Sequence, residues 1–162
     1  MHPKLFSLDS KGVEKILRMK SETNKLLERI KAILNDYSEV TAAYLFGSRA
    51  EGYQRQGSDV DIAILVDSRL DKMRTFSLQL DLGDVLERKL KRQVDLLVLN
   101  HAPLAIAFRA VKGILILERN PTERALFESR ILSRYYDYRR FLRFHLKALY
   151  HRIKEGKFAA SG

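Results

Sequence analysis

Cysteine and tryptophan are absent from this chain of 162 residues, and it has only three prolines. Without cysteine the chain has no disulfide, no thiolate nucleophile and no zinc–thiolate site. Carboxylates and imidazoles are the side chains left to bind a metal. We therefore expect any bound metal to be a hard ion held by oxygen ligands.

Long apolar runs are also missing. Charged residues interrupt every apolar stretch before it reaches the roughly 18 to 20 residues that span a bilayer. Residues 1–10 lack the basic head and apolar segment of an export signal. We therefore expect a soluble protein in the cytoplasm, with no membrane partner.

The net charge is +10, with 30 basic residues against 20 acidic ones. Such a field attracts polyanions, so it favours a partner such as nucleic acid, nucleotide phosphates or an acidic protein. Solubility alone, or the basic enrichment of proteins from high-temperature organisms, explains the charge equally well. The charge therefore leaves the partner open.

Hydrophobic periodicity predicts an α/β (α+β) fold, in which a small mixed sheet is flanked by helices and followed by a long C-terminal helix. Apolar content of 46% and the short length favour one compact unit. We expect the sheet to carry acidic residues on one face and helices against the other. We divide the chain into a catalytic domain over residues 1–118, with its N-terminal helix, and a helical extension of the same unit over 119–162. The predicted helices cover 12–37, 69–90, 104–111 and 122–154, with Thr122 as the N-cap of the last, and the predicted strands cover 40–46, 60–66, 93–99 and 114–117.

The segment from Leu45 to Asp61, LFGSRAEGYQRQGSDVD, joins two predicted strands through a glycine-rich loop. Alternation along a strand places Asp59 and Asp61 on the same face, so both carboxylates can reach one ion or a pair of ions. Apolar residues follow at once, and unpaired negative charges beside a core are costly. The spacing therefore predicts a cation at this point.

The loop also has the residues of a phosphate site. Gly47 lets the backbone approach a phosphate closely, and Ser48 supplies a hydroxyl and begins a short helical turn. Arg49 either contacts phosphate or is simply solvated, with equal weight. Ser58 is either a structural hydrogen-bonding residue, which we favour, or a contact to metal-bound water.

Asp95 is a lone acid inside an otherwise apolar predicted strand. Three carboxylates that converge on two metal ions would explain it, because in-line displacement at phosphorus uses one metal on each of the attacking and leaving oxygens. Asp59, Asp61 and Asp95 are thus the predicted catalytic residues and metal ligands, with Mg²⁺ as the expected metal, Mn²⁺ as an alternative and ATP as substrate. Asp95 would also accept or orient the acceptor's proton. An acid on an edge strand is the alternative interpretation of Asp95.

This arrangement resembles the signature of the DNA polymerase β-like nucleotidyltransferase superfamily: Gly-Ser, ten residues, Asp-x-Asp, and a later third Asp. Here Ser48 is followed by residues 49–58, then Asp59 and Asp61, and Asp95 lies near the start of a later predicted strand, QVDLLVL. The small size, the GSRAEG loop and the tail resemble the MNT group of minimal nucleotidyltransferases, which are encoded beside HEPN-domain proteins. The resemblance implies a metal-dependent antitoxin that transfers AMP from ATP to a tyrosine of a HEPN ribonuclease toxin.

Other functions remain open at this point. One alternative is a stand-alone nucleotidyltransferase that acts on a small molecule or an RNA end, although RNA binding is not favoured. Another alternative is a non-catalytic antitoxin that inhibits its toxin by covering it. The protein could form a hetero-oligomer with the toxin or a homo-oligomer. The last predicted helix carries apolar residues at helical spacing that either pack on the core or dock a partner: Tyr135, Tyr138, Leu142, Leu146, Leu149 and Ile153.

Overall fold

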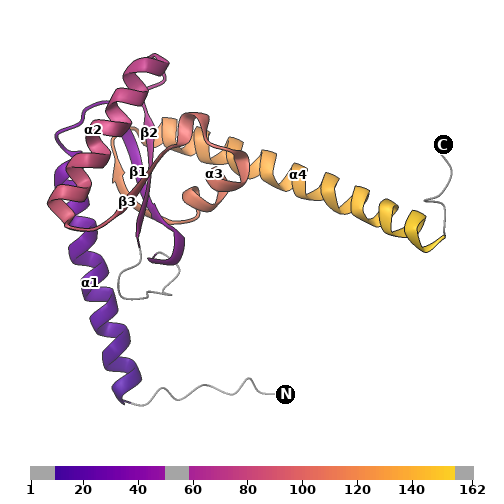
Figure 1. Ribbon diagram of the computed structural model, residues 1–162, viewed down its shortest axis with the longest axis horizontal. Helices are drawn as coiled ribbons and strands as arrows, with labels where there is room; N and C mark the ends of the chain where they lie inside the picture. The colour runs from indigo at the N-terminus through magenta and orange to yellow at the C-terminus, as the bar shows by residue number, and fades with distance from the viewer. Residues whose placement is uncertain (1–9, 50–58, 156–162) are drawn as a thin grey trace.

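A computed structural model describes residues 10–49 and 59–155 of the chain, and Figure 1 shows their arrangement. The elements follow the order predicted from the sequence. In chain order they are α1 (Ser10–Leu34), β1 (Val40–Phe46), the 3-10 helix η1 (Gly47–Arg49), β2 (Val60–Val66), α2 (Lys72–Leu90), β3 (Val94–Val98), the 3-10 helix η2 (Leu99–His101), α3 (Leu104–Val111), β4 (Ile114–Glu118) and α4 (Pro121–Lys154).

The four strands form one sheet in the order β3-β2-β1-β4. β1 pairs antiparallel with both β2 and β4, whereas β2 and β3 are parallel. The predicted mixed sheet is therefore confirmed. Because β1 runs opposite to its neighbours, the end of β1 lies at the same sheet edge as the beginnings of β2 and β3. Residues that are distant in sequence meet at this edge.

Helices cover both faces of the sheet, with α1 and α2 on one side and α3 and α4 on the other (Figure 1). Our expectation that helices lie only against the face opposite the acidic residues was wrong. β1 and β2 are buried at six of their seven positions each, so neither side of these strands can face water. Strands that are buried on both faces read as continuous apolar runs and need a helical layer on each side.

The long helix α4 begins one residue before the predicted start. Its N-cap is Asn120, whose side-chain oxygen accepts a hydrogen bond from the backbone N–H of Glu123 at 3.1 Å. The predicted cap, Thr122, instead lies inside the first turn. Pro121 fits the first helical position because its fixed φ suits a helix and it has no N–H to satisfy.

Helix α2 is confirmed, but its first half does not bury the apolar residues that suggested it. Met73, Phe76 and Leu80 are exposed, and the helix packs through Leu82 and Leu86 and its last residue, Leu90.

Among the described residues, no helix is long and apolar enough to span a membrane.

Arg119 ties the end of α1 to the start of β1. Its guanidinium donates to the carbonyl oxygens of Leu34 and Val40, both at 3.0 Å, and of Asn35 at 3.2 Å. A helix leaves its last carbonyls without partners in the helix, and a cation there also suits the helix dipole. Arg119 therefore stabilises this junction.

Arg119→Ala is expected to lower the free energy of unfolding by about 1 to 3 kcal/mol, because several carbonyls lose a charged donor together. Arg119→Lys should recover only part of the loss, since an ammonium cannot reproduce the planar fork. Urea unfolding followed by circular dichroism measures both, with the exposed Arg92→Ala as the control. Equal midpoints for Arg119→Ala and wild type would show that the junction does not depend on this side chain.

A buried tyrosine links the sheet to α4. Tyr44 is 1% exposed and donates its hydroxyl to Glu128 at 2.8 Å. Glu128 also accepts from Arg124 at 2.7 Å, and Arg124 bonds Glu118 of β4. Burial, followed by the Glu128 carboxylate, raises the pKa of Tyr44 far above its usual value.

Tyr44→Phe is expected to cost about 1 kcal/mol at neutral pH, since Glu128 keeps its bond to Arg124. The difference from wild type should shrink above about pH 10, where the unfolded chain ionises its tyrosine while folded Tyr44 holds its proton. The stability that Tyr44 adds to the wild-type protein is fully present below the pKa of tyrosine in the unfolded chain, and it is lost as the pH rises above that value. Urea unfolding of both proteins at pH 8 and pH 10.5 measures this, and a pH-independent difference would contradict it.

Candidate active site

The acidic residues and the Gly-Ser turn meet at the sheet edge where β1 ends. Gly47 follows β1 directly and has φ +72°, a conformation that residues with a side chain adopt rarely. A Cβ atom on Gly47 would overlap the carboxylate of Asp61 and lie 2.9 Å from its Cγ. The turn therefore requires glycine for two reasons, its backbone conformation and its contact with Asp61.

The register of the sheet places Asp61 between Phe46 of β1 and Asp95 of β3. Asp61 and Asp95 are direct partners on parallel strands, so their Cα atoms are neighbours about 5 Å apart across the ladder. Both residues fall on the same face as Ala63 and Leu65, the face that α3 and α4 cover further along the strands. The predicted convergence of Asp61 and Asp95 is thus seen in the backbone.

Asp59 lies just before β2. The N–H of Val60 donates to the carbonyl of Gln93 at 3.0 Å, so the pairing with the β3 side begins next to Asp59. Asp59 is two residues before Asp61, and alternation puts both on one face. Asp59 and Asp95 are exposed and Asp61 is half-buried, so the group opens to solvent where the helical layer ends.

The donor set suits a hard divalent cation, because it consists of carboxylates on one face of one edge. Among the described residues, however, no group of three or more His, Asp or Glu side chains is close enough to hold a metal ion. The backbone brings the three aspartates together, but their side chains do not form a closed site. Metal binding by Asp59, Asp61 and Asp95 remains a prediction.

The other predicted site residues are placed less fully. Ser48 is half-buried in η1, which confirms the short helical turn that was expected after β1. Arg49 ends η1, and the structure describes its backbone only. Ser58 lies outside the described residues. The phosphate-binding roles of Gly47, Ser48, Arg49 and Ser58 remain predictions.

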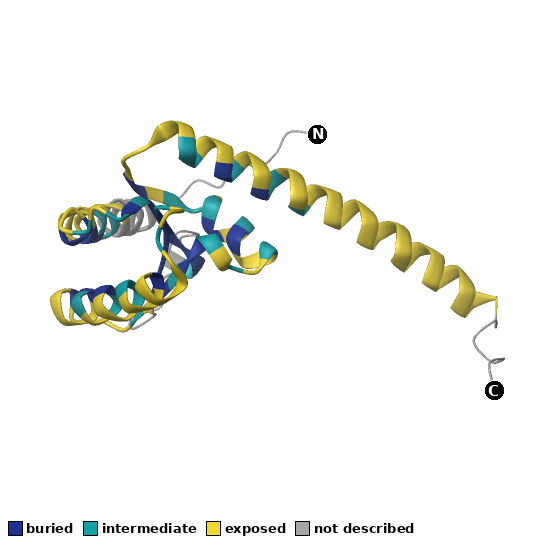
Figure 2. Cartoon of the chain, turned by 90° about the horizontal axis from the view of Figure 1, so that it is seen from above, coloured by how far each residue is buried: buried dark blue, intermediate teal, exposed yellow. Residues whose placement is uncertain are grey.

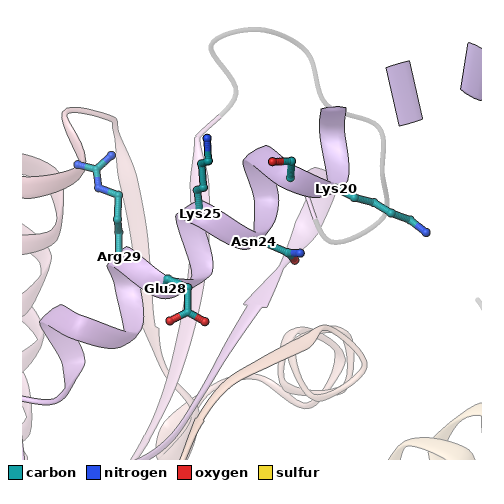
Figure 3. Close-up of a pocket in the computed structure, with 6 residues that line it drawn as sticks. Lys20, Asn24, Lys25, Glu28 and Arg29 are labelled. Carbon is teal, nitrogen blue, oxygen red and sulfur yellow. The ribbon is translucent and has the colours of Figure 1, made fainter. Parts of the chain in front are cut away.

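One charged surface was not predicted from the sequence: an open hollow of about 670 Å³ lies along α1. Figure 3 shows its side chains, with Lys20, Lys25 and Arg29 among the six residues that line it. All six come from the same helix, so the described residues form only one wall. In the sequence these cations look like the polar side of an amphipathic helix, and no motif distinguished them.

The fold and the site together define a nucleotidyltransferase: a mixed sheet with a Gly-Ser turn at the end of one strand, one aspartate just before the next strand, and one aspartate on each of the next two. The family model of the polymerase beta nucleotidyltransferases matches residues 28–122, which include β1 to β4 and all three aspartates. This chain belongs to that family.

Two relatives resemble the chain over 65% and 82% of its length. The protein adenylyltransferase MntA of Shewanella oneidensis is 29% identical over 106 residues, which are 65% of this chain and 73% of MntA. The crystal structure of a toxin-antitoxin with AMP-PNP contains a chain that is 27% identical, with a TM-score of 0.57, covering 82% of this chain and 98% of that one.

The likeness to a further solved structure supports the fold only, because the two sequences are 24% identical. That structure is described as a tri-AMPylated Shewanella oneidensis HEPN toxin in complex with MNT antitoxin. The TM-score is 0.54, and the match covers 84% of this chain and 98% of the other.

Proposed function

We propose that this protein is an antitoxin that transfers AMP from ATP to a tyrosine of a cognate HEPN ribonuclease toxin and thereby neutralises it. The observation that carries the proposal is the direct pairing of Asp61 with Asp95 beside the Gly47 turn. The pairing of β2 with β3 places two negative charges side by side, which destabilises the sheet. Proteins keep such unfavourable arrangements mainly at functional sites. MntA is named a protein adenylyltransferase, and the sequence resembles the MNT group.

In the proposed reaction, the tyrosine oxygen of the partner attacks the α-phosphorus of ATP. The bond from that phosphorus to the bridging oxygen breaks, and pyrophosphate leaves with the electron pair. Asp95 accepts or orients the proton of the tyrosine hydroxyl, since it is the exposed carboxylate on the outer of the two strands. The AMP group remains on the tyrosine as a phosphodiester.

The turn and the two aspartates of the Asp-x-Asp pair position the nucleotide. The backbone at Gly47 and the Ser48 hydroxyl would bind the triphosphate, and Arg49 adds positive charge. Asp59 and Asp61 would hold Mg²⁺, and Asp95 would contact one ion as well; the metal supplies neutralisation of charge on the attacking and leaving oxygens. Mn²⁺ has the same ligand preference and is the alternative.

The proposal also assigns a role to each part of the chain. Residues 1–118 make the nucleotidyltransferase domain, and 119–162 extend it toward the partner. We propose a cytoplasmic reaction, since ATP is its substrate. The toxin is the protein partner, and the active complex is a hetero-oligomer.

Intact mass spectrometry of a candidate HEPN-domain partner, co-expressed with this chain, tests the proposal. The two proteins are incubated with ATP and Mg²⁺, and the matched sample contains Asp59→Ala plus Asp61→Ala. One or more AMP additions to the partner, absent with the double variant and after EDTA, are expected, and tandem fragmentation should place them on tyrosine. An unmodified partner that wild-type protein and double variant neutralise equally well would instead establish inhibition by covering.

A further inference from the structure

The apolar face that fixes α4 to the core continues far beyond the core. Phe127 and Ile131 are buried, and Tyr135 stacks on Phe108 of α3 with ring centroids 3.7 Å apart. The same line of three- and four-residue steps then runs on through Tyr138, Leu142, Leu146, Leu149 and Ile153. Residues at these spacings lie on one side of a helix. We call these five residues the apolar stripe.

The helix that carries the stripe projects from the domain. Residues 136–154, which we call the distal arm, extend away from the sheet and are exposed throughout (Figures 1 and 2). The stripe residues are 39% to 57% exposed. In proteins most of the stability of a helix comes from packing of its apolar face, so this face gains most when another element covers it.

The chemistry of the stripe selects the kind of partner. Steps of four, four, three and four residues, with Leu and Ile at four of the five positions, place the stripe on one side of the helix, as in the seam that one helix presents to another. From Tyr138 to Ile153 the seam is about 24 Å long, at 1.5 Å per residue. It therefore fits a partner helix of four to five turns.

Charge decides among the helices that could dock there. The distal arm has six basic residues and one acidic residue, Asp137. Arg139, Arg143 and Lys147 each directly follow a stripe residue, so they form a basic ridge along one side of it. Flanking charges of this kind set the choice of partner. A second copy of the arm would bring basic residues against basic residues, whereas an acidic helix would pair with them.

We propose that the distal arm docks an acidic amphipathic helix of the partner protein, with the apolar stripe in contact and the basic ridge paired to carboxylates. That the partner is the HEPN toxin rests on the proposed function. That the partner presents an acidic amphipathic helix rests only on the apolar stripe and the basic ridge. The arm binds the partner while the site at the sheet edge modifies it. RNA is less suited to this surface, because four of the five stripe residues are Leu or Ile, which offer nothing to phosphates or to base stacking.

Binding of a candidate HEPN-domain partner protein tests the proposal, by biolayer interferometry at 50 and 300 mM salt. Leu142→Ala plus Leu149→Ala removes part of the stripe, and Arg139→Glu plus Arg143→Glu reverses part of the ridge. Each is expected to weaken binding at least ten-fold, and the charge variant should also reduce the salt dependence. The control, Lys72→Glu plus Lys112→Glu, makes the same charge change at exposed positions on α2 and after α3 and should bind like wild type.

Neither pair of arm residues is in the active site, so at saturating partner the arm variants should transfer AMP at the wild-type rate, with a raised KM for the partner. Unchanged binding by both arm variants would overturn the docking proposal and leave the proposed function intact. A partner that binds through the arm but is never modified would refute the proposed function alone. Two further results would also overturn the docking proposal: a dimer of the isolated chain that Leu142→Ala plus Leu149→Ala dissolves, or RNA binding that only the arginine variant loses.

Discussion

Asp61→Asn is expected to slow AMP transfer by roughly 10²- to 10³-fold, the size of effect seen when one preorganised charge-stabilising group is lost. Asp61 is half-buried, touches the Gly47 turn and lies directly opposite Asp95, so it is the central carboxylate of the three. Asparagine keeps the shape of the side chain and removes its charge. Single-turnover transfer to the HEPN partner, measured by intact mass, gives the rate.

The same substitution should leave the protein folded. Asp61 and Asp95 place two like charges on neighbouring strands, which destabilises a sheet by a few tenths of a kcal/mol or more. Asp95→Asn should therefore not lower Tm, and a small rise is expected. Asp84→Asn is the matched control, since Asp84 is an exposed acid on α2, over the opposite face of the sheet. A full transfer rate in Asp61→Asn would remove this edge as the active site.

Gly47→Ala is expected to impair both stability and catalysis. The φ of +72° costs a residue with a Cβ about 1 kcal/mol or more, and the added methyl must also displace the Asp61 carboxylate. We expect the free energy of unfolding to fall by about 1 to 3 kcal/mol. Transfer should fall by roughly 100-fold, because a misplacement of about 1 Å at a reacting centre has that effect.

Gly83→Ala is the matched control for this substitution. Gly83 lies inside α2, where an added Cβ meets no atom within 4 Å. Alanine there should raise the free energy of unfolding by about 0.5 to 1 kcal/mol and leave transfer unchanged. Urea unfolding and the transfer assay compare the two variants directly. Equal behaviour of Gly47→Ala and Gly83→Ala would contradict the role assigned to the turn.

Local features of the sequence predicted the elements well. β1 and β2 begin and end at the predicted residues, because each is a short apolar run between polar segments. Helix α3 also matches in full. The start of α4 was misplaced because Pro121 and Thr122 both fit a helix start, and only the geometry shows that Asn120 makes the capping hydrogen bond.

The assembly of these elements depended on information that local sequence does not contain. The spacing of residues does not predict that Asp61 pairs with Asp95. The register of two parallel strands is set by how their apolar side chains pack in the core, and residues next to each other in the sequence do not determine it. The exposed Met73 and Phe76 show the same limit, because helical spacing identifies an apolar side without showing what covers it. The layer over the second sheet face was missed although the strands were known to be apolar.

The parallel pairing of β2 with β3 also makes activity a test of complete folding. Asp59 and Asp61 are close to Gly47 along the chain, but Asp95 reaches them only after α2 has crossed back to the same sheet edge. Such non-local contacts form late, because the intervening chain must be ordered before they are gained. A chain cut or unfolded within α2 would keep the Asp-x-Asp pair and lose its third carboxylate. Catalytic competence and resistance to proteolysis in this region should therefore appear together during refolding.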